Sequence, residues 1–253
     1  MKPGLRALVT NDDGIDSPGP AVLAEAAGAA GLDVVVAVPD RQYSGASAAL
    51  TAVQEHGRTV TEPRPPVGGA PAYAVHAAPA HIVVAAAHGW LDPPPDLVLS
   101  GVNRGANVGR AVLHSGTVGA ALTAGLYGGR GLAVSLDVAL DSDRPEHWDA
   151  VSPHLPSVLR MLCAGPAGTT LSLNVPDRPA AEHRELRTAP LDPRGSVQTV
   201  VAETGNEGLL LREVGTDAPP EPGSDRALLA AGHPTLTALA GVRETSVPAW
   251  GDR

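Results

Sequence analysis

Two adjacent carboxylates, Asp12 and Asp13, lie in the stretch LVTNDDGIDSPG at residues 8–19. Residues 5–10 are apolar and predict a strand, and the Asn-Asp-Asp-Gly turn ends that strand and directs side chains off its carboxyl end. Ligands of open α/β sheets bind at this edge, and hard divalent cations are held by carboxylate oxygens. The alternative is an Asx turn whose acids cap a helix beginning near residues 17–19. This stretch by itself leaves both interpretations open.

Two further polar residues follow predicted strands. Ser44 comes after residues 33–39, and Asn103 comes after residues 97–100. Together with Asp12 and Asp13 they offer two carboxylates, a hydroxyl and an amide carbonyl, a set that suits Mg²⁺, Mn²⁺ or Ca²⁺. The sequence contains no Cys and His cluster with zinc spacing. We therefore predict a site for one divalent cation in each subunit.

A second chemical element is the turn at Ser115, Gly116 and Thr117, which begins a predicted helix. Its N–H groups and hydroxyls would lie at the positive end of the helix dipole, where anions bind. The alternative is an ordinary Ser or Thr N-cap. The nearby metal loops favour the anion site.

Alternating apolar segments must position these loops. The predicted strands cover residues 5–10, 33–39, 97–100, 132–136 and 170–175, and the predicted helices cover residues 19–30, 80–89, 115–127 and 151–162. This alternation predicts an α/β fold with three layers and a mostly parallel, doubly wound, Rossmann-like sheet.

The pattern changes in the C-terminal part of the chain. Residues 196–202 and 209–213 read as two strands around a TGNEG turn, a hairpin-like appendage. We predict a catalytic core over residues 1–185 and a C-terminal hairpin and tail over residues 186–253. Because a lone hairpin exposes its edges and an apolar face, pairing with another subunit is expected.

Composition and net charge indicate which classes of binding partner are compatible with the chain. A net charge of −9 argues against a nucleic-acid polymer, because a phosphate backbone requires a basic surface. A small phosphorylated substrate remains compatible, since backbone N–H groups and one cation can hold a single anion. The most apolar stretch, residues 82–91, is too short and broken to span a bilayer, so no membrane partner is expected. The single Cys163 suits a reducing cytoplasm.

Five motifs in order carry a family resemblance: NDDG with SPG, DRQYSGAS, SGVNRGANVG, HSGTVGAAL and NVPD. They resemble the SurE (survival protein E) family of metal-dependent nucleotidases over roughly residues 5–178. More weakly, GSDRALLAAGHPTLTAL at residues 223–239 is similar to the closing segment of that family.

The resemblance implies hydrolysis of phosphate monoesters, typically nucleoside 5′- or 3′-monophosphates. It implies Mg²⁺ or Mn²⁺ on Asp12, Asp13, Ser44 and Asn103, and assembly as a homodimer or homotetramer through an exchanged C-terminal region. It also implies a phosphate site, where we expect these residues: Asn11, Gly45, Asn107, His114, Ser115, Gly116 and Thr117.

The expected chemistry is metal-assisted hydrolysis, in which the cation neutralises nonbridging oxygens and activates water. Asp12 or Asp13 could instead act as base or nucleophile, and the sequence does not decide between these roles. His114 could supply a general acid.

The chain also departs from the family pattern. Residues Ala77 to Ile82 stand where the family usually has Gly-Thr-Pro-Thr-Asp-Cys, His114 replaces a usual Tyr, and Tyr43 replaces a usual Arg. One alternative is therefore the same phosphatase chemistry on a specialised phosphorylated metabolite or biosynthetic intermediate. Another, from a different class, is a noncatalytic nucleotide or phosphate sensor.

Overall fold

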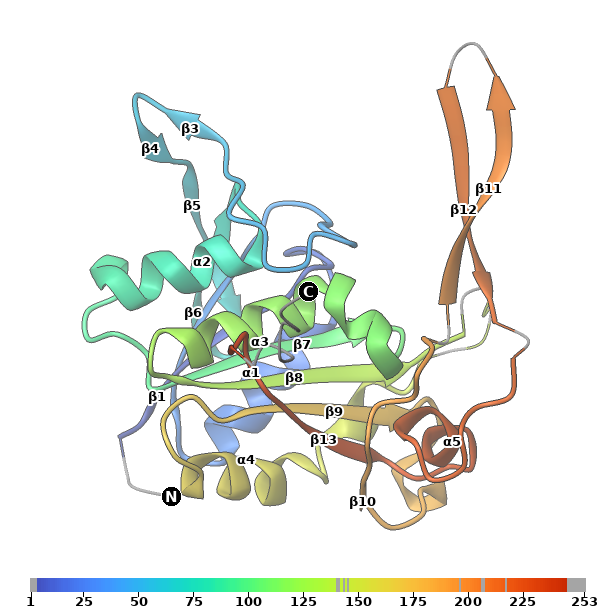
Figure 1. Cartoon of the computed structure of the whole chain (residues 1–253). Helices are drawn as coiled ribbons and strands as arrows, with labels where there is room; N and C mark the ends of the chain where they lie inside the picture. The colour runs from blue at the N-terminus through green and yellow to red at the C-terminus, as the bar shows by residue number, and fades with distance from the viewer. Residues whose placement is uncertain are drawn as a thin grey trace, which may run out of the picture.

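A nine-stranded sheet forms the centre of the protein (Figure 1). The structure is a computed structural model that describes residues 4–139, 142, 144, 146–195, 197–205, 208–216 and 218–244. The strand order is β10-β13-β9-β8-β7-β1-β2-β6-β5. Neighbouring strands are parallel except at the pairs β5–β6 and β13–β9. The prediction of a mostly parallel, doubly wound α/β sheet is confirmed.

The strands of this sheet and the two small hairpins are short. They are β1 (Arg6–Thr10), β2 (Asp33–Pro39), β3 (Gln54–Glu55), β4 (Arg58–Thr59), β5 (Thr61–Val67), β6 (Ala70–Val75), β7 (Leu97–Arg104), β8 (Arg130–Asp137), β9 (Thr170–Pro176), β10 (Arg187–Thr188), β11 (Val197–Gly205), β12 (Gly208–Gly215) and β13 (Thr235–Leu239).

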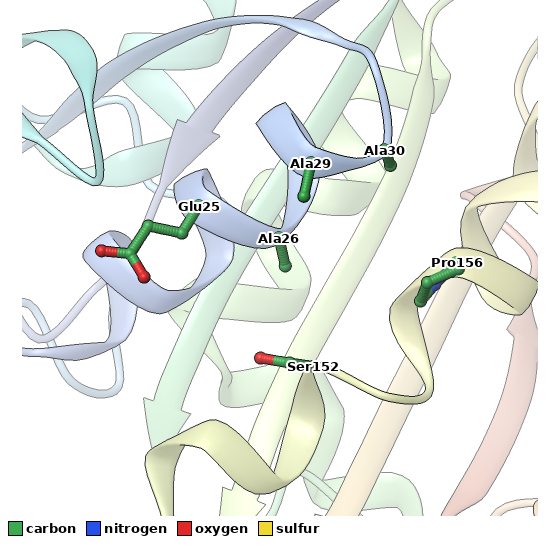
Figure 2. Close-up of a pocket in the computed structure, with 6 residues that line it drawn as sticks. All are labelled: Glu25, Ala26, Ala29, Ala30, Ser152 and Pro156. Atoms are coloured by element: carbon green, nitrogen blue, oxygen red, sulfur yellow. The ribbon is translucent and has the colours of Figure 1, made fainter.

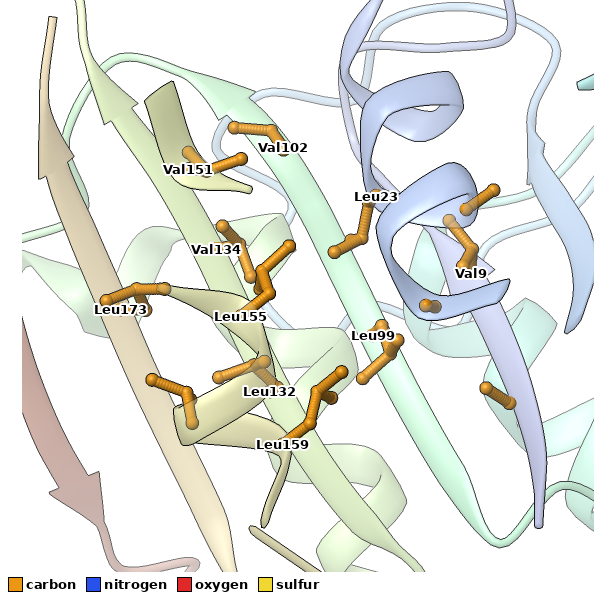
Figure 3. Packing of buried hydrophobic residues seen from close by; sticks show 14 of the residues in the cluster. Val9, Leu23, Leu99, Val102, Leu132, Val134, Val151, Leu155, Leu159 and Leu173 are labelled. Atoms are coloured by element: carbon orange, nitrogen blue, oxygen red, sulfur yellow. The ribbon is translucent and has the colours of Figure 1, made fainter. Parts of the chain in front are cut away.

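Helices cover both faces of the sheet, so that the sheet is the middle one of three layers. One face carries α1 (Gly19–Ala29) and α4 (Leu155–Ala164), and the other carries α2 (Pro79–Ala85) and α3 (Gly116–Leu126). Successive side chains of a strand point to opposite faces, so in β1 Val9 packs with α1 while Leu8 packs with α2. Figure 3 shows the aliphatic core under α1 and α4, which is built without Phe.

The remaining elements of the described residues are a short C-terminal α-helix, a π-helix (η1) and 3₁₀-helices (η2, η3 and η4). They are α5 (Asp225–Ala230), η1 (Ala86–Trp90), η2 (Gly109–His114), η3 (Trp148–Val151) and η4 (Ala180–Glu182). In the described part of the chain, no helix combines the length and apolar character needed to cross a membrane.

Several element boundaries differ from the sequence prediction. The strand predicted to end at Ser100 continues to Arg104, because pairing with β8 resumes at Asn103 after an irregularity. The helix predicted over residues 80–89 is α-helical only to Ala85 and continues as the π-helix η1, in which Gly89 has φ +93°. The sequence did not predict the edge strand β5, because it contains prolines, which are unusual in strands. At the edge of the sheet, where β5 lies, proline is tolerated.

The C-terminal part divides between the sheet and an appendage. Strands β11 and β12 form a separate antiparallel hairpin that projects from the body of the molecule (Figure 1). This confirms the predicted hairpin. Strands β10 and β13, from the same part of the chain, join the main sheet, while the division at residues 185 and 186 stays a prediction.

Core packing by α4 gives a direct test of this architecture. Leu159 is fully buried, whereas Met161 on the same helix is 46% exposed. We expect Leu159→Ala to lower the free energy of unfolding by about 2–5 kcal/mol, because it leaves a cavity. Met161→Ala is the matched control and should cost less than about 1 kcal/mol. Urea denaturation measures both, and equal losses would contradict the packing described.

Candidate metal and phosphate site

The carboxyl ends of β1 and β7 bring three predicted metal ligands together. The two strands are parallel neighbours with Thr10 opposite Ser100, so the residues that follow share one edge of the sheet. The Thr117 hydroxyl donates to Asp12 Oδ1, and its oxygen lies 3.2 Å from Asn103 Oδ1. The backbone N–H of Arg104 donates to Asp13 Oδ2 at 3.0 Å. Asp12, Asp13 and Asn103 are thus held around one point.

Asp12 is an acid in an unfavourable place for negative charge. It is 4% exposed, and this burial raises its pKa to about 6. The Thr117 hydroxyl and N–H lower the pKa, whereas the charge of Asp13 raises it further. Burial likewise raises the pKa of Asp13, while the N–H and charge of Arg104 lower it. Two neighbouring carboxylates in such surroundings fit a divalent cation, which would offset their charge.

The rest of a cation's ligand set would be neutral oxygen. Among the described residues, no three side chains of His, Cys, Asp or Glu converge as a metal site. The Asn103 carbonyl oxygen and water would therefore have to complete the shell, as hard cations such as Mg²⁺ accept.

Helix α3 points its N-terminus at Asp12. Ser115 is the N-cap, and its hydroxyl accepts the Val118 N–H at 3.1 Å. A Cβ on Gly116 would lie 2.7 Å from Asp12 Oδ2, so glycine at this position lets the carboxylate approach the helix. Among the described residues no acceptor is found for the Gly116 N–H, so this donor is available to an anion.

The loop after β2 reaches the same edge through its backbone. The Tyr43 N–H donates to the Asp12 carbonyl at 2.7 Å. Ser44 is exposed and its hydroxyl accepts a hydrogen bond from Gln42 at 2.9 Å, and Gly45 follows at φ +77°. The structure places Ser44 beside the site, with its hydroxyl turned to Gln42.

Ser47 joins this loop to the α3 turn and was missed from the sequence. Its N–H donates to His114 O at 3.2 Å, and its hydroxyl donates to Leu113 O at 2.7 Å. A Cβ on Gly119 would meet Ser47 O at 2.3 Å. The small residues spaced along HSGTVGAAL are the sequence signal for this close approach.

Four predicted phosphate residues have distinct positions. Asn11 is fully buried and its amide group bridges the turn, donating to Gly14 O at 2.9 Å and accepting from Gly14 N at 3.3 Å. Asn107 Nδ2 donates to Ser135 Oγ at 2.8 Å. Thr117 is fully buried against Asp12 and Asn103, whereas His114 is exposed. Asn11 and Thr117 therefore shape the candidate site, and His114 is exposed just before the α3 turn.

Arg104 is a further neighbour that the motif analysis did not single out. Its Nε donates to Glu146 Oε1 at 2.6 Å, while its N–H holds Asp13. Its position directly after Asn103 was the available signal.

A surface hollow lies elsewhere, on the face that carries α1 and α4 (Figure 2). It measures about 390 Å³ and is lined by Glu25, Ala26, Ala29, Ala30, Ser152 and Pro156. None of the predicted site residues lines it.

Buried Asp12 predicts a pH-dependent stability for the metal-free protein. Because folding raises its pKa from 3.8 to about 6, its protonated form supports folding below about pH 4, and this support is lost as pH rises through 6. Asp12→Asn removes the titration. We expect the stability of wild type relative to Asp12→Asn to fall by about 2 kcal/mol between pH 4.5 and 7.5.

Urea unfolding in a chelator, at several pH values, measures this difference. Asp16→Asn is the matched control, since Asp16 is an exposed acid of the same loop. It measures the effect of losing a carboxylate that is not buried. A pH-independent difference between wild type and Asp12→Asn would contradict the burial of the Asp12 charge.

Comparisons with known proteins show the family of this chain. Residues 7–196 match the family described as Survival protein SurE. The 5′-nucleotidase SurE of Xanthomonas campestris pv. campestris (strain B100) is 34% identical over 241 residues, covering 93% of this chain and 89% of that protein. The 5′-nucleotidase SurE of Dehalococcoides mccartyi (strain CBDB1) is 36% identical over 206 residues, covering 81% and 75%.

Among solved structures, the SurE protein from Aquifex aeolicus superposes with a TM-score of 0.74 at 25% identity, covering 94% of this chain and 93% of that one. The family match spans most of the chain, and the same motifs form the edge of the sheet described above. This chain belongs to the SurE family.

Proposed function

We propose that this protein is a divalent-metal-dependent phosphomonoester hydrolase that dephosphorylates nucleoside 5′- or 3′-monophosphates. The observation that carries the proposal is the convergence of Asp12 and Asn103 on Thr117, with Asp13 alongside. The relatives named 5′-nucleotidase SurE support the reaction class and the 5′ substrate. The 3′ activity rests on the resemblance of the motifs.

The residues available to the cation are Asp12, Asp13, Asn103 and, after a side-chain rotation away from Gln42, Ser44. Mg²⁺ or Mn²⁺ would neutralise charge on the phosphate oxygens, and Ca²⁺ could occupy the same oxygen ligands. The Gly116 N–H at the start of α3 would orient the phosphate, and Ser115 holds this turn in shape as N-cap.

Two proton-transfer assignments are compatible with this site. Asp13 is half-buried and so more accessible than Asp12, which favours Asp13 where a carboxylate acts as base or nucleophile. His114, exposed at the end of η2, could protonate the leaving oxygen.

Removing a ligand charge tests the metal site. We expect Asp12→Asn to lower kcat/KM by about a hundredfold or more, because the cation loses a carboxylate. A chelator should abolish wild-type activity, and Mn²⁺ should restore it. Phosphate release from a nucleoside 5′-monophosphate measures both, with Asp16→Asn expected to behave as wild type. Full activity of Asp12→Asn would refute the assignment of Asp12 as a metal ligand. If wild type shows no metal-dependent turnover of any substrate, the noncatalytic nucleotide or phosphate sensor is favoured instead.

The altered segment from Ala77 to Ile82 bears on the substrate. Ala77, Ala78, Ala80 and Ile82 are fully buried, and His81 Nε2 lies 3.0 Å from Thr59 Oγ1 of β4. The four apolar residues therefore belong to the core at α2, and His81 joins the start of α2 to the β3–β4 hairpin. This supports ordinary nucleotides over the specialised metabolite, and a panel of nucleotides, sugar phosphates and polyphosphate with Mn²⁺ would separate the two substrates.

We also propose that the β11–β12 hairpin pairs with a second copy of the chain. Its exposed side chains include Val201, Leu209 and Leu211, at 55%, 68% and 54% exposure, and Val201 lies opposite Leu211 across the strands. An isolated two-stranded hairpin is only marginally stable in water. Apolar side chains on such a hairpin favour a partner that covers them.

Charges on the hairpin test this assembly. We expect the double variant Leu209→Lys and Leu211→Lys to sediment as a monomer at micromolar concentration, because lysine cannot be buried unpaired at an apolar contact. Leu126→Lys, at a site 75% exposed on α3, is the control and should leave the wild-type oligomer intact. A monomeric wild type would overturn the proposal.

A further inference from the structure

A buried carboxylate outside the predicted set of metal ligands holds the segment between β7 and α3. Asp225, at the start of α5, is fully buried. Its Oδ2 accepts the N–H of Gly109 at 2.8 Å, and its Oδ1 accepts the N–H groups of Asp192 and Arg226, each at 2.8 Å. Three backbone donors thus converge on one side chain, which uses both of its oxygens.

Gly109 is the point where this segment comes closest to the C-terminal part of the chain. It has φ +62°, and a Cβ there would lie 1.9 Å from Arg194 O. The next residue, Arg110, donates its N–H to Asp192 O at 3.0 Å. Gly109 follows Asn107 by two residues and precedes His114 and Ser115 in the same segment.

The carboxylates of Asp192 and Asp225 both lie at the base of the β11–β12 hairpin. Asp192 precedes β11, and Asp225 follows β12. The Asp192 carboxylate accepts from Arg194 N, Glu221 N and the Ser224 hydroxyl, at 2.9, 2.7 and 2.9 Å. Its bonds therefore stay within the base of the hairpin, whereas the Asp225 carboxylate also reaches the segment that leads to α3.

We infer that Asp225 is a positioning residue for phosphate hydrolysis, acting through the Gly109 N–H on the segment that carries Asn107 and His114. This inference rests on the proposed placement of the substrate phosphate at the α3 turn. Small displacements of positioning groups are costly in rate.

The test compares two buried acids. Asp225→Asn keeps the shape but leaves one acceptor oxygen for three N–H donors, and its NH₂ group faces a donor. We expect kcat/KM for a nucleoside 5′-monophosphate with Mn²⁺ to fall by about tenfold or more, and hydrogen exchange of residues 105–115 to become faster. Asp192→Asn is the matched control: it should lower the melting temperature, while kcat/KM stays within about twofold of wild type and exchange of residues 105–115 is unchanged.

Gly109→Ala tests the same contact from the other side. Its Cβ would collide with Arg194 O and Asp192 O and so displace the backbone whose N–H donates to Asp225. It should reproduce the kinetic loss of Asp225→Asn. In wild type, the Gly109 amide should exchange among the slowest of residues 105–115, a measurement that requires no variant.

Three results would overturn the inference: wild-type kcat/KM in Asp225→Asn, equal kinetic losses in Asp225→Asn and Asp192→Asn, or rapid exchange of the Gly109 amide in wild type. Asp12→Asn in the same assay separates this inference from the proposed function. If Asp12→Asn is inactive and Asp225→Asn is normal, only the positioning role fails. If Asp12→Asn is fully active, the proposed site itself fails.

Discussion

The burial of the Asp12 carboxylate against the N-terminus of α3 is the constraint on which the site depends. Desolvation disfavours its charge, and the Thr117 hydroxyl and N–H compensate only in part, because the pKa remains near 6. This contact requires a glycine at residue 116, where a Cβ would meet the carboxylate. It also fixes the distance between β1, which delivers Asp12, and α3, which follows β7. Burial of this charge lowers the stability of the metal-free protein above the pKa of Asp12, and a bound divalent cation would offset the charge.

Close backbone approaches recur around this edge of the sheet. Gly119 admits the Ser47 carbonyl, and Gly109 admits the Arg194 carbonyl. Each contact joins segments that are distant in sequence, and each would be blocked by a single Cβ. The loops around the site are therefore held by backbone hydrogen bonds and small residues instead of large side chains, which suits a chain with no Phe and an aliphatic core.

The C-terminal part of the chain has two roles in this architecture. Strands β10 and β13 extend the sheet, whereas β11 and β12 leave it as a hairpin with exposed apolar side chains. Asp192 and Asp225 stand where these two parts meet. The Asp225 carboxylate accepts the Gly109 N–H, and the Asp192 backbone carbonyl accepts the Arg110 N–H. The base of the hairpin and the segment that leads to α3 are thus joined by hydrogen bonds.

By itself, the sequence determined the alternation of strands and helices, the loops that hold Asp12, Asp13 and Asn103, and the family to which the chain belongs. These features are local: apolar periodicity, turn chemistry and ordered motifs are read within short windows. Only the tertiary structure decided that Thr117 contacts the predicted metal ligands Asp12 and Asn103, that Ala77, Ala78, Ala80 and Ile82 are core, and that Asp225 binds Gly109. Contacts of this second kind join residues up to 116 positions apart, and no local pattern specifies them, because they depend on which strand ends the folded sheet places side by side.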